Sequence, residues 1–345
     1  MDRKYTIAVD TMGGDNAPLV VIAGIDSICG YLEENRIDLL LFGQTELLAP
    51  LLAKYPAVSR ISRVIQADEV VVPDDKPSRV IRSGRKTSMW MAIESVRNKE
   101  ADAVVSAGNT GCLMGISKLL ISMIEGIRRP AITTCIPSDG GKFTTLLDLG
   151  ANAECDEYNI FEFAIMGSTY AKLSMGIERP KVSILNIGSE AGKGLEYLNK
   201  AAQLIEHNKE NISFDYSGFV EGDDIFKGKV DVIVTDGFSG NISLKTLEGT
   251  VKFVVSELKS VFRKSVMSMI GLLFMYFRLR KFKKRLDPRE YNGAVFLGLN
   301  GIVVKSHGGT DAYGFACAMK YAVRLVTADF AVKVQEEMEK MDENE

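Results

Sequence analysis

Short runs of aliphatic residues alternate with longer stretches of helical hydrophobic spacing along most of the chain. A loop rich in Gly, Asn or Ser follows each run. The runs are almost continuously apolar, which is typical of strands buried on both faces of a parallel sheet. They lie within residues 6–10, 38–43, 102–108, 144–150, 182–188, 230–236 and 301–309.

Strands that alternate with helical segments predict an α/β fold with a mostly parallel sheet covered by helices on both faces. No linker is evident, so we expect a single domain over residues 1–345, with an embedded helical hairpin over 247–290. In such a sheet the loops at the carboxyl ends of the strands gather at one edge, where ligands bind. The unusual polar residues of this chain lie in those loops.

Composition narrows the class of protein. The 345 residues are 46% hydrophobic and 25% charged, with a net charge of −3, which argues against a nucleic-acid-binding protein. The first residues do not resemble a signal peptide, because Asp10 ends a short apolar run. The five cysteines are dispersed without CxxC spacing, which indicates reduced thiols in the cytoplasm rather than disulfides or a zinc site.

Four strand-end loops have the composition of an anion site. Glycines allow close approach of the backbone, and free N–H groups at a helix N-terminus bind anions. Lys193 adds an ammonium group, and Asn241 can cap the following helix and also reach into a site. The loops contain Ser106, Gly108, Asn109 and Thr110; Gly188, Ser189 and Lys193; Asp236, Gly237, Ser239, Gly240 and Asn241; and residues 306–311.

Each loop also has a purely structural interpretation. Glycine-rich turns between strand and helix occur in every α/β protein, and Lys193 alone is typical of a solvated lysine. Asp10 at a strand end can simply hold the TMGGD loop, and His307 fits a hydrogen-bonded structural role better than that of a base. The functional interpretation therefore depends on convergence of the loops at one edge of the sheet.

Seven sequence blocks resemble the acyl-carrier-protein:phosphate acyltransferases of bacterial lipid synthesis, the PlsX family. The blocks occur in family order and span nearly the whole chain. They are DTMGGDNAP (10–18), SAGNTGCLMG (106–115), RPAI (129–132), LLDLGANAECDEYNIFEFAIMGSTYAK (146–172), VSILNIGSEAGKG (182–194), DVIVTDGFSGNISLKTLEG (231–249) and SHGGTDAYGFACAMKYA (306–322).

This resemblance implies a three-layer αβα fold like that of isocitrate and isopropylmalate dehydrogenases. It also implies a homodimer in the cytoplasm, peripherally associated with the inner face of an anionic membrane. The substrates would be a long-chain fatty acyl group on acyl carrier protein and inorganic phosphate, and the product would be acyl phosphate. By matching motif, Lys193 and Asn241 are the expected catalytic residues.

The expected mechanism needs no metal, no nicotinamide and no strong base, because phosphate is already nucleophilic. Amides of the 106–111 and 188–194 loops would hold phosphate with Lys193, while Asn241 would face the oxyanion. A covalent acyl group on Cys112 or Cys317 is disfavoured, since neither cysteine has an evident histidine partner. The expected substrate-binding residues are Asp10, Gly13, Gly14, Ser106, Gly108, Asn109, Thr110, Gly188, Asp236, Gly240 and His307.

An uncharged segment, SVMSMIGLLFMYF (265–277), follows a helical pattern that begins at Leu247. It is shorter than the roughly 20 residues that cross a bilayer. The basic run at 278–285 favours an interfacial anchor in which Leu272, Leu273 and Phe274 contact the membrane. A buried hairpin tip or a dimer contact is the alternative, and the basic run can also dock an acidic carrier protein.

Three rival functions remain open from the sequence. A phosphotransacetylase-like enzyme would use acyl-coenzyme A with the same chemistry. A metal-dependent decarboxylating dehydrogenase would need clustered aspartates, for which Asp223 and Asp224 alone are insufficient. A non-catalytic scaffold docked on the membrane would show no turnover.

Overall fold

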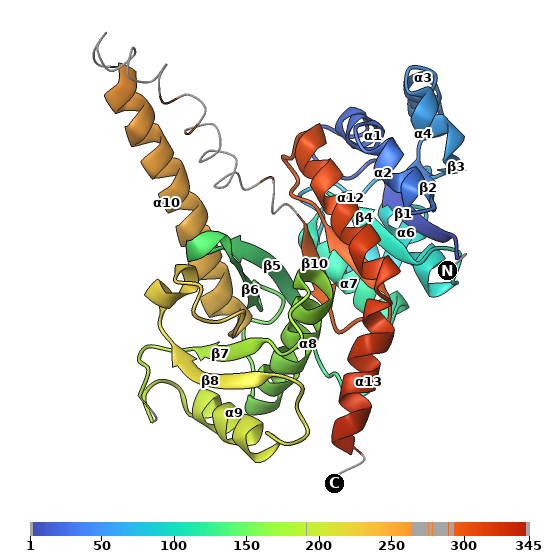
Figure 1. The fold of residues 1–345 in the computed structure, drawn as a ribbon. Helices are drawn as coiled ribbons and strands as arrows, with labels where there is room; N and C mark the ends of the chain where they lie inside the picture. Colours follow the sequence, from blue (N-terminus) through green and yellow to red (C-terminus); the bar gives the residue numbers. More distant parts are fainter. Residues whose placement is uncertain are drawn as a thin grey trace.

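The computed structural model describes residues 3–190, 192–263 and 293–342, together with Met275, Arg278 and Arg289 (Figure 1). Most of the expected hairpin after Arg263, including Leu272, Leu273 and Phe274, lies outside the described residues. Among the described helices, none is both long enough and apolar enough to cross a bilayer.

One sheet contains all eleven described strands, in the order β3-β2-β1-β4-β11-β10-β5-β6-β9-β7-β8. The seven predicted runs all form strands, whereas β3, β5, β8 and β10 were not predicted. The strands are β1 (Tyr5–Asp10), β2 (Ile37–Gly43), β3 (Ser62–Gln66), β4 (Ala103–Ser106), β5 (Ala131–Pro137), β6 (Phe143–Leu147), β7 (Lys181–Leu185), β8 (Asp215–Val220), β9 (Val232–Val234), β10 (Ala294–Leu297) and β11 (Ile302–Lys305).

The centre of the sheet reverses strand direction. Strand β10 pairs antiparallel with both β11 and β5, and β5 pairs antiparallel with β6. All other described pairings are parallel. Strands β1–β4 and β11 therefore run in one direction, and β6–β9 run in the opposite direction.

The described helices account for most of the remaining chain. Several begin at a polar cap of the expected kind: Asn109 accepts a hydrogen bond from Cys112 N, and Asp156 forms a capping box with Asn159. The helices are α1 (Leu19–Asp26), α2 (Cys29–Glu34), α3 (Thr45–Leu52), α4 (Pro56–Arg60), α5 (Pro77–Ser83), α6 (Ser88–Arg97), α7 (Thr110–Leu120), α8 (Glu157–Met175), α9 (Glu196–His207), α10 (Gly237–Arg263), α12 (Ala312–Thr327) and α13 (Phe330–Asp342), with short 3₁₀ turns at Asp139–Gly141 and Gly222–Phe226.

Two hydrophobic cores lie on the two faces of the sheet. Along β1, Ile7 and Val9 belong to one core and Ala8 belongs to the other, as the period of two in a strand requires. The first core includes buried residues of α1, α8, α12 and α13, and the second includes those of α6 and α7. This arrangement confirms the predicted three-layer αβα fold with a mostly parallel sheet.

Helix α10 departs from this packing. It begins at Gly237, within the GFSGN loop that was expected to precede it, and its far end projects away from the sheet (Figure 1). Leu244 and Leu247 pack against the second core, whereas Phe253, Val254, Leu258 and Val261 are exposed.

Candidate active site

A buried carboxylate joins the loops at the ends of β1 and β4. Asp10 is 1% exposed, and its two oxygens accept hydrogen bonds from Ser88 Oγ and Ser106 Oγ, each at 2.6 Å. Burial raises the pKa of Asp10, while the two hydroxyls and the amides of Met12 and Gly13 act to lower it. Asp10 therefore holds the TMGGD loop, as its structural interpretation proposed.

The glycines of this region pack too closely for any side chain. A Cβ atom on Gly13 would lie 2.5 Å from Asp10 Oδ2 and 2.7 Å from the amide nitrogen of Gly108. Gly14 has a positive φ of 104°, and a Cβ there would lie 3.1 Å from the carbonyl oxygen of Gly308. The loops after β1, β4 and β11 are thus in direct backbone contact.

The loop after β4 leads into α7 as predicted. Asn109 caps this helix with its Oδ1, and its Nδ2 donates to the carbonyl oxygen of Pro73 at 2.7 Å. Thr110 and Gly111 are exposed at the start of the helix. The backbone amides of this turn are therefore positioned beside solvent, where an anion can reach them.

The loop after β11 is attached to its neighbours through the backbone. Ser306 N donates to Ser106 O, and Asp15 N donates to Gly308 O, both at 2.9 Å. His307 is exposed, and its Nδ1 accepts the N–H of Gly309 at 3.2 Å. This hydrogen bond agrees with the structural role expected for His307.

A second buried carboxylate organises the loop after β6. Asp148 is fully buried and accepts hydrogen bonds from the backbone amides of Ile132, Gly150, Ala151 and Asn152 at 2.8–3.1 Å. Burial raises its pKa, while these donors and the Asn152 carboxamide act to lower it. The loop 148–152 is therefore fixed by its own first residue.

Asn241 rests against this loop. Its Nδ2 donates to the carbonyl oxygen of Leu149 at 3.0 Å. The expectation that Asn241 caps the helix is wrong, because α10 already begins at Gly237. Asp236 fills the capping role instead: its Oδ1 accepts the N–H of Ser239 at 2.8 Å, and its Oδ2 accepts the hydroxyl of Tyr197 at 3.0 Å.

The loop that carries Lys193 is held by two asparagines. Asn186 Nδ2 and Asn199 Nδ2 both donate to the carbonyl oxygen of Lys193 at 3.0 Å. The Lys193 side chain is 54% exposed, its ammonium lies 2.9 Å from Glu190 Oε2, and this pair raises the pKa of the lysine. Lys193 is thus a charged, movable group on a fixed loop, beside Gly188.

The strand directions correct the expectation that all four loops share one edge of the sheet. Residues 10–15, 106–110 and 306–311 follow β1, β4 and β11, whereas residues 148–152, 188–194 and 236–241 follow β6, β7 and β9. These two sets of strands run in opposite directions in the same sheet. The amides of residues 106–111 and Lys193 therefore do not lie at the same edge of the sheet, which contradicts the expectation that they hold one phosphate together. The sequence did not show this reversal, because β5 and β10 were not predicted.

Several residues of these loops were missed from the sequence. Lys305 is 9% exposed at the end of β11, and burial lowers its pKa to about 8, although Asp10 and Asp15 act to raise it. Nor was a role predicted from the sequence for Asp148, Asn152 or Tyr197. Lys305 and Asp148 could have been found by their position, because each lies at the end of an apolar run.

Three candidate residues of the rival chemistries, Asp223, Asp224 and Cys112, lie in surroundings that disfavour those roles. Asp224 lies 3.0 Å from Lys227 and 2.9 Å from Lys229, and these hydrogen-bonded ammonium groups lower its pKa to about 2. Asp223 pairs with Lys227 as well. Cys112 is fully buried, and burial together with Asp75 raises its pKa, so its thiolate is disfavoured.

Comparison with known proteins assigns the family. A model of the fatty acid synthesis protein family matches residues 5–333. The chain belongs to this family. It is 47% identical to a phosphate acyltransferase of Paramagnetospirillum magneticum, covering 99% of this chain and 96% of that protein. It is 46% identical to a phosphate acyltransferase of Parvibaculum lavamentivorans, covering 99% of this chain and 93% of that protein. These relatives identify an acyltransferase.

Solved structures share the fold at low sequence identity. A phosphotransacetylase from Streptococcus pyogenes matches with a TM-score of 0.64 and 16% identity, covering 95% of both chains. An assigned 4-hydroxythreonine-4-phosphate dehydrogenase of Salmonella typhimurium matches with a TM-score of 0.54 and 14% identity, covering 94% of this chain and 100% of that chain. At this identity the likeness concerns the fold alone.

Proposed function

We propose that the protein transfers a long-chain fatty acyl group from acyl carrier protein to inorganic phosphate, forming acyl phosphate for phospholipid synthesis. The observation that carries this proposal is the nearly full-length similarity to proteins named phosphate acyltransferase. Membership of the fatty acid synthesis protein family supports a role in lipid synthesis. The seven sequence blocks support the carrier-protein thioester as the acyl donor.

Lys193 and Asn241 are assigned different tasks. Lys193 is exposed and charged, and among the described residues its ion pair is with the exposed Glu190, so it can turn toward an incoming phosphate. Asn241 is fixed by its bond to Leu149 O, and its carboxamide carries a second N–H that can face a thioester oxyanion. A donor that is already oriented stabilises developing charge without reorganisation.

The test is turnover of palmitoyl-carrier protein with phosphate, followed by detection of acyl phosphate. We expect Lys193→Ala and Asn241→Ala each to lower kcat by roughly 10²–10³-fold, as loss of one oxyanion donor does. Lys200→Ala is the matched control, since Lys200 is an exposed lysine paired with Glu196 at 2.8 Å just after this loop. Near-normal rates in both folded variants would remove the two residues from the mechanism.

The same assay addresses the rival functions. A phosphotransacetylase-like enzyme would turn over short acyl-coenzyme A in preference to palmitoyl-carrier protein, and the shared fold supports this second candidate. A scaffold would turn over neither substrate.

We further propose a cytoplasmic homodimer that associates peripherally with the inner membrane face through residues 265–285. Support comes from the uncharged segment and its basic neighbour. Changing Leu272, Leu273 and Phe274 to Glu should abolish flotation with anionic liposomes, whereas Leu119→Glu, on an exposed leucine of α7, should not. Full flotation of the triple variant would contradict the anchor.

A further inference from the structure

Lys305 is a buried lysine that the proposed mechanism leaves unused. It ends β11, directly beside Ser106 at the end of β4. Its Nζ donates to the carbonyl oxygen of Ala107 at 3.4 Å and also to that of Ser306. The ammonium therefore lies beneath the junction of two loops, 106–111 and 306–311, that have the composition of an anion site.

The charge of this ammonium is incompletely compensated. Among the described residues, no carboxylate lies within ion-pair distance of Lys305 Nζ, and the two bonded carbonyls are neutral. Asp10 already accepts from Ser88 and Ser106, and Asp15 is exposed. Taking a charge out of water without a close counter-ion is unfavourable, so a buried cation of this kind favours an arriving anion.

The surroundings define which anion fits. The loop backbones are in contact through Gly14 and Gly308, and the surface above them is exposed at Thr110, His307 and Gly309. The amides of the α7 N-terminus provide directional donors, and Lys305 provides the positive charge. Such a combination suits a compact group with several oxygens, which is a phosphoryl group.

We propose that Lys305 is the buried cation of a phosphoryl-binding site formed by the loops after β4 and β11, separate from the loop of Lys193. The phosphoryl group comes either from inorganic phosphate, the acyl acceptor, or from the phosphopantetheine of the acyl donor. The inference rests on the proposed function only for the naming of these two sources. Binding itself is tested without turnover.

The first experiment measures the binding of inorganic phosphate and of pantetheine 4′-phosphate by calorimetry. Lys305→Met should weaken one of them about 30-fold or more, as loss of one partner of a buried charge pair does. Lys305→Arg, which keeps the charge, should recover part of the loss, and Lys54→Met, on an exposed lysine, should change nothing. Weaker binding of phosphate alone identifies the site of the acyl acceptor. Weaker binding of pantetheine 4′-phosphate alone identifies the site of the acyl donor.

A second measurement uses the unaltered protein, so it does not depend on the folding of a variant. The groups that face Lys305 are Asp10 and Asp15, with His307 following in the same loop. With the lysine pKa lowered to about 8, the ammonium is charged below that pH and neutral above it. Affinity for the phosphoryl ligand should therefore fall above pH 8, by up to about tenfold per pH unit, until the pKa of the complex is reached.

Two results would overturn the inference. One is a folded Lys305→Met variant that binds each ligand as tightly as the unaltered protein does. The other is an affinity of the unaltered protein that stays constant between pH 8 and 9.5. Either result is compatible with normal production of acyl phosphate, in which case the proposed function stands and only the site fails. If no acyl phosphate forms but phosphate binding depends on Lys305, the site stands and the proposed function fails.

Discussion

Gly240 lies where α10 meets the loop after β6, one residue before Asn241. A Cβ atom there would be 1.9 Å from the carbonyl oxygen of Asp148, which is backbone and cannot turn aside. The close approach allows Asn241 to reach Leu149 O. The identity of this residue is therefore set by the distance between two backbones, and the position of the carboxamide follows from it.

Gly240→Ala should destabilise the protein by about 1–3 kcal/mol, since an added methyl group must displace α10 or the loop. It should also lower turnover by moving Asn241. Gly249→Ala is the matched control in the same helix, because no atom lies within 4 Å of its added Cβ. For Gly249→Ala we expect the free energy of unfolding to rise by about 0.5–1 kcal/mol, because alanine has the higher helix propensity. Urea unfolding and acyl phosphate assays measure both effects, and equal behaviour of the two variants would refute the close contact.

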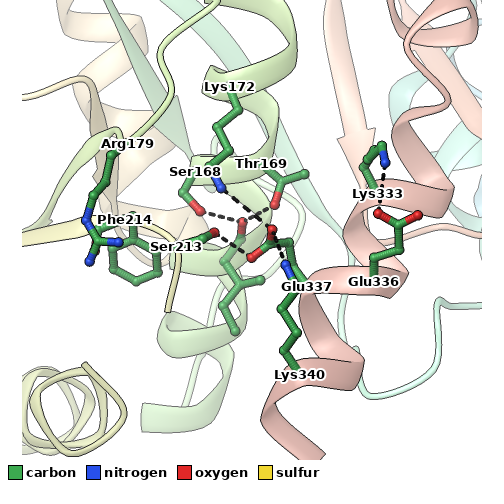
Figure 2. Close-up of polar contacts among 11 residues, drawn as sticks. Ser168, Thr169, Lys172, Arg179, Ser213, Phe214, Lys333, Glu336, Glu337 and Lys340 are labelled. Atoms are coloured by element: carbon green, nitrogen blue, oxygen red, sulfur yellow. Dashed lines mark hydrogen bonds and ion pairs between the residues drawn. The ribbon is translucent and has the colours of Figure 1, made fainter. Parts of the chain in front are cut away.

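At the scale of elements, one carboxylate of α13 adds a polar contact to its packing against the first core. Glu337 accepts a hydrogen bond from Ser213 Oγ, which precedes β8, and lies 3.6 Å from Lys172 of α8 and 3.0 Å from Lys340 (Figure 2). Burial alone would raise the pKa of Glu337, but the Ser213 hydroxyl and the two ammonium groups lower it below 4.5. The contact thus joins three elements that are distant in the sequence.

Because the folded-state pKa is lowered, the stabilisation is present above about pH 4.5 and is lost as pH falls through the folded value. Glu337→Gln should therefore cost about 1 kcal/mol of unfolding free energy at pH 7. The difference from the unaltered protein should shrink below pH 4.5. Glu336→Gln serves as control, since the Glu336 carboxylate is exposed and pairs with the exposed Lys333 at 2.9 Å (Figure 2). Similar pH profiles for both variants would contradict the assigned contact.

At the scale of the whole molecule, α10 presents apolar residues that nothing in the described chain covers. Val254, Leu258 and Val261 are 43%, 39% and 55% exposed and recur at intervals of four and three residues, which places them on one face. An exposed apolar stripe of this kind is typical of an interface. It supports the proposed homodimer, with a second copy of the chain as the partner.

Analytical ultracentrifugation checks this proposal. The double variant Val254→Glu/Leu258→Glu should sediment as a monomer at a concentration where the unaltered protein is a dimer, because buried unpaired carboxylates oppose association. Lys252→Glu/Ser256→Glu adds carboxylates with the same spacing on the other side of the helix and should remain dimeric. An interface on this face would be refuted if Val254→Glu/Leu258→Glu remained dimeric, or if the unaltered protein were already monomeric.

The sequence by itself determined the fold class, the seven principal strands and the family. Strands such as Ile7–Val9 are buried on both faces, so their apolar runs are visible without the fold. Local rules also identified Asn109 at the start of a helix and the loop-holding role of Asp10. These features depend on neighbouring residues or on burial, and both leave a pattern along the chain.

Tertiary structure alone decided how the loops are divided. Strands β10 (Ala294–Leu297) and β5 (Ala131–Pro137) were not predicted as strands, and β5 carries the polar residues Thr133 and Thr134 within its run. Their antiparallel pairing reverses the sheet and separates the loops of Lys193 and Asn241 from those of Asp10 and Lys305. Burial of Lys305 likewise depends on the packing of β11 beside β4. Strand direction and the burial of a lone charge are properties of pairing between distant segments, which no local pattern records.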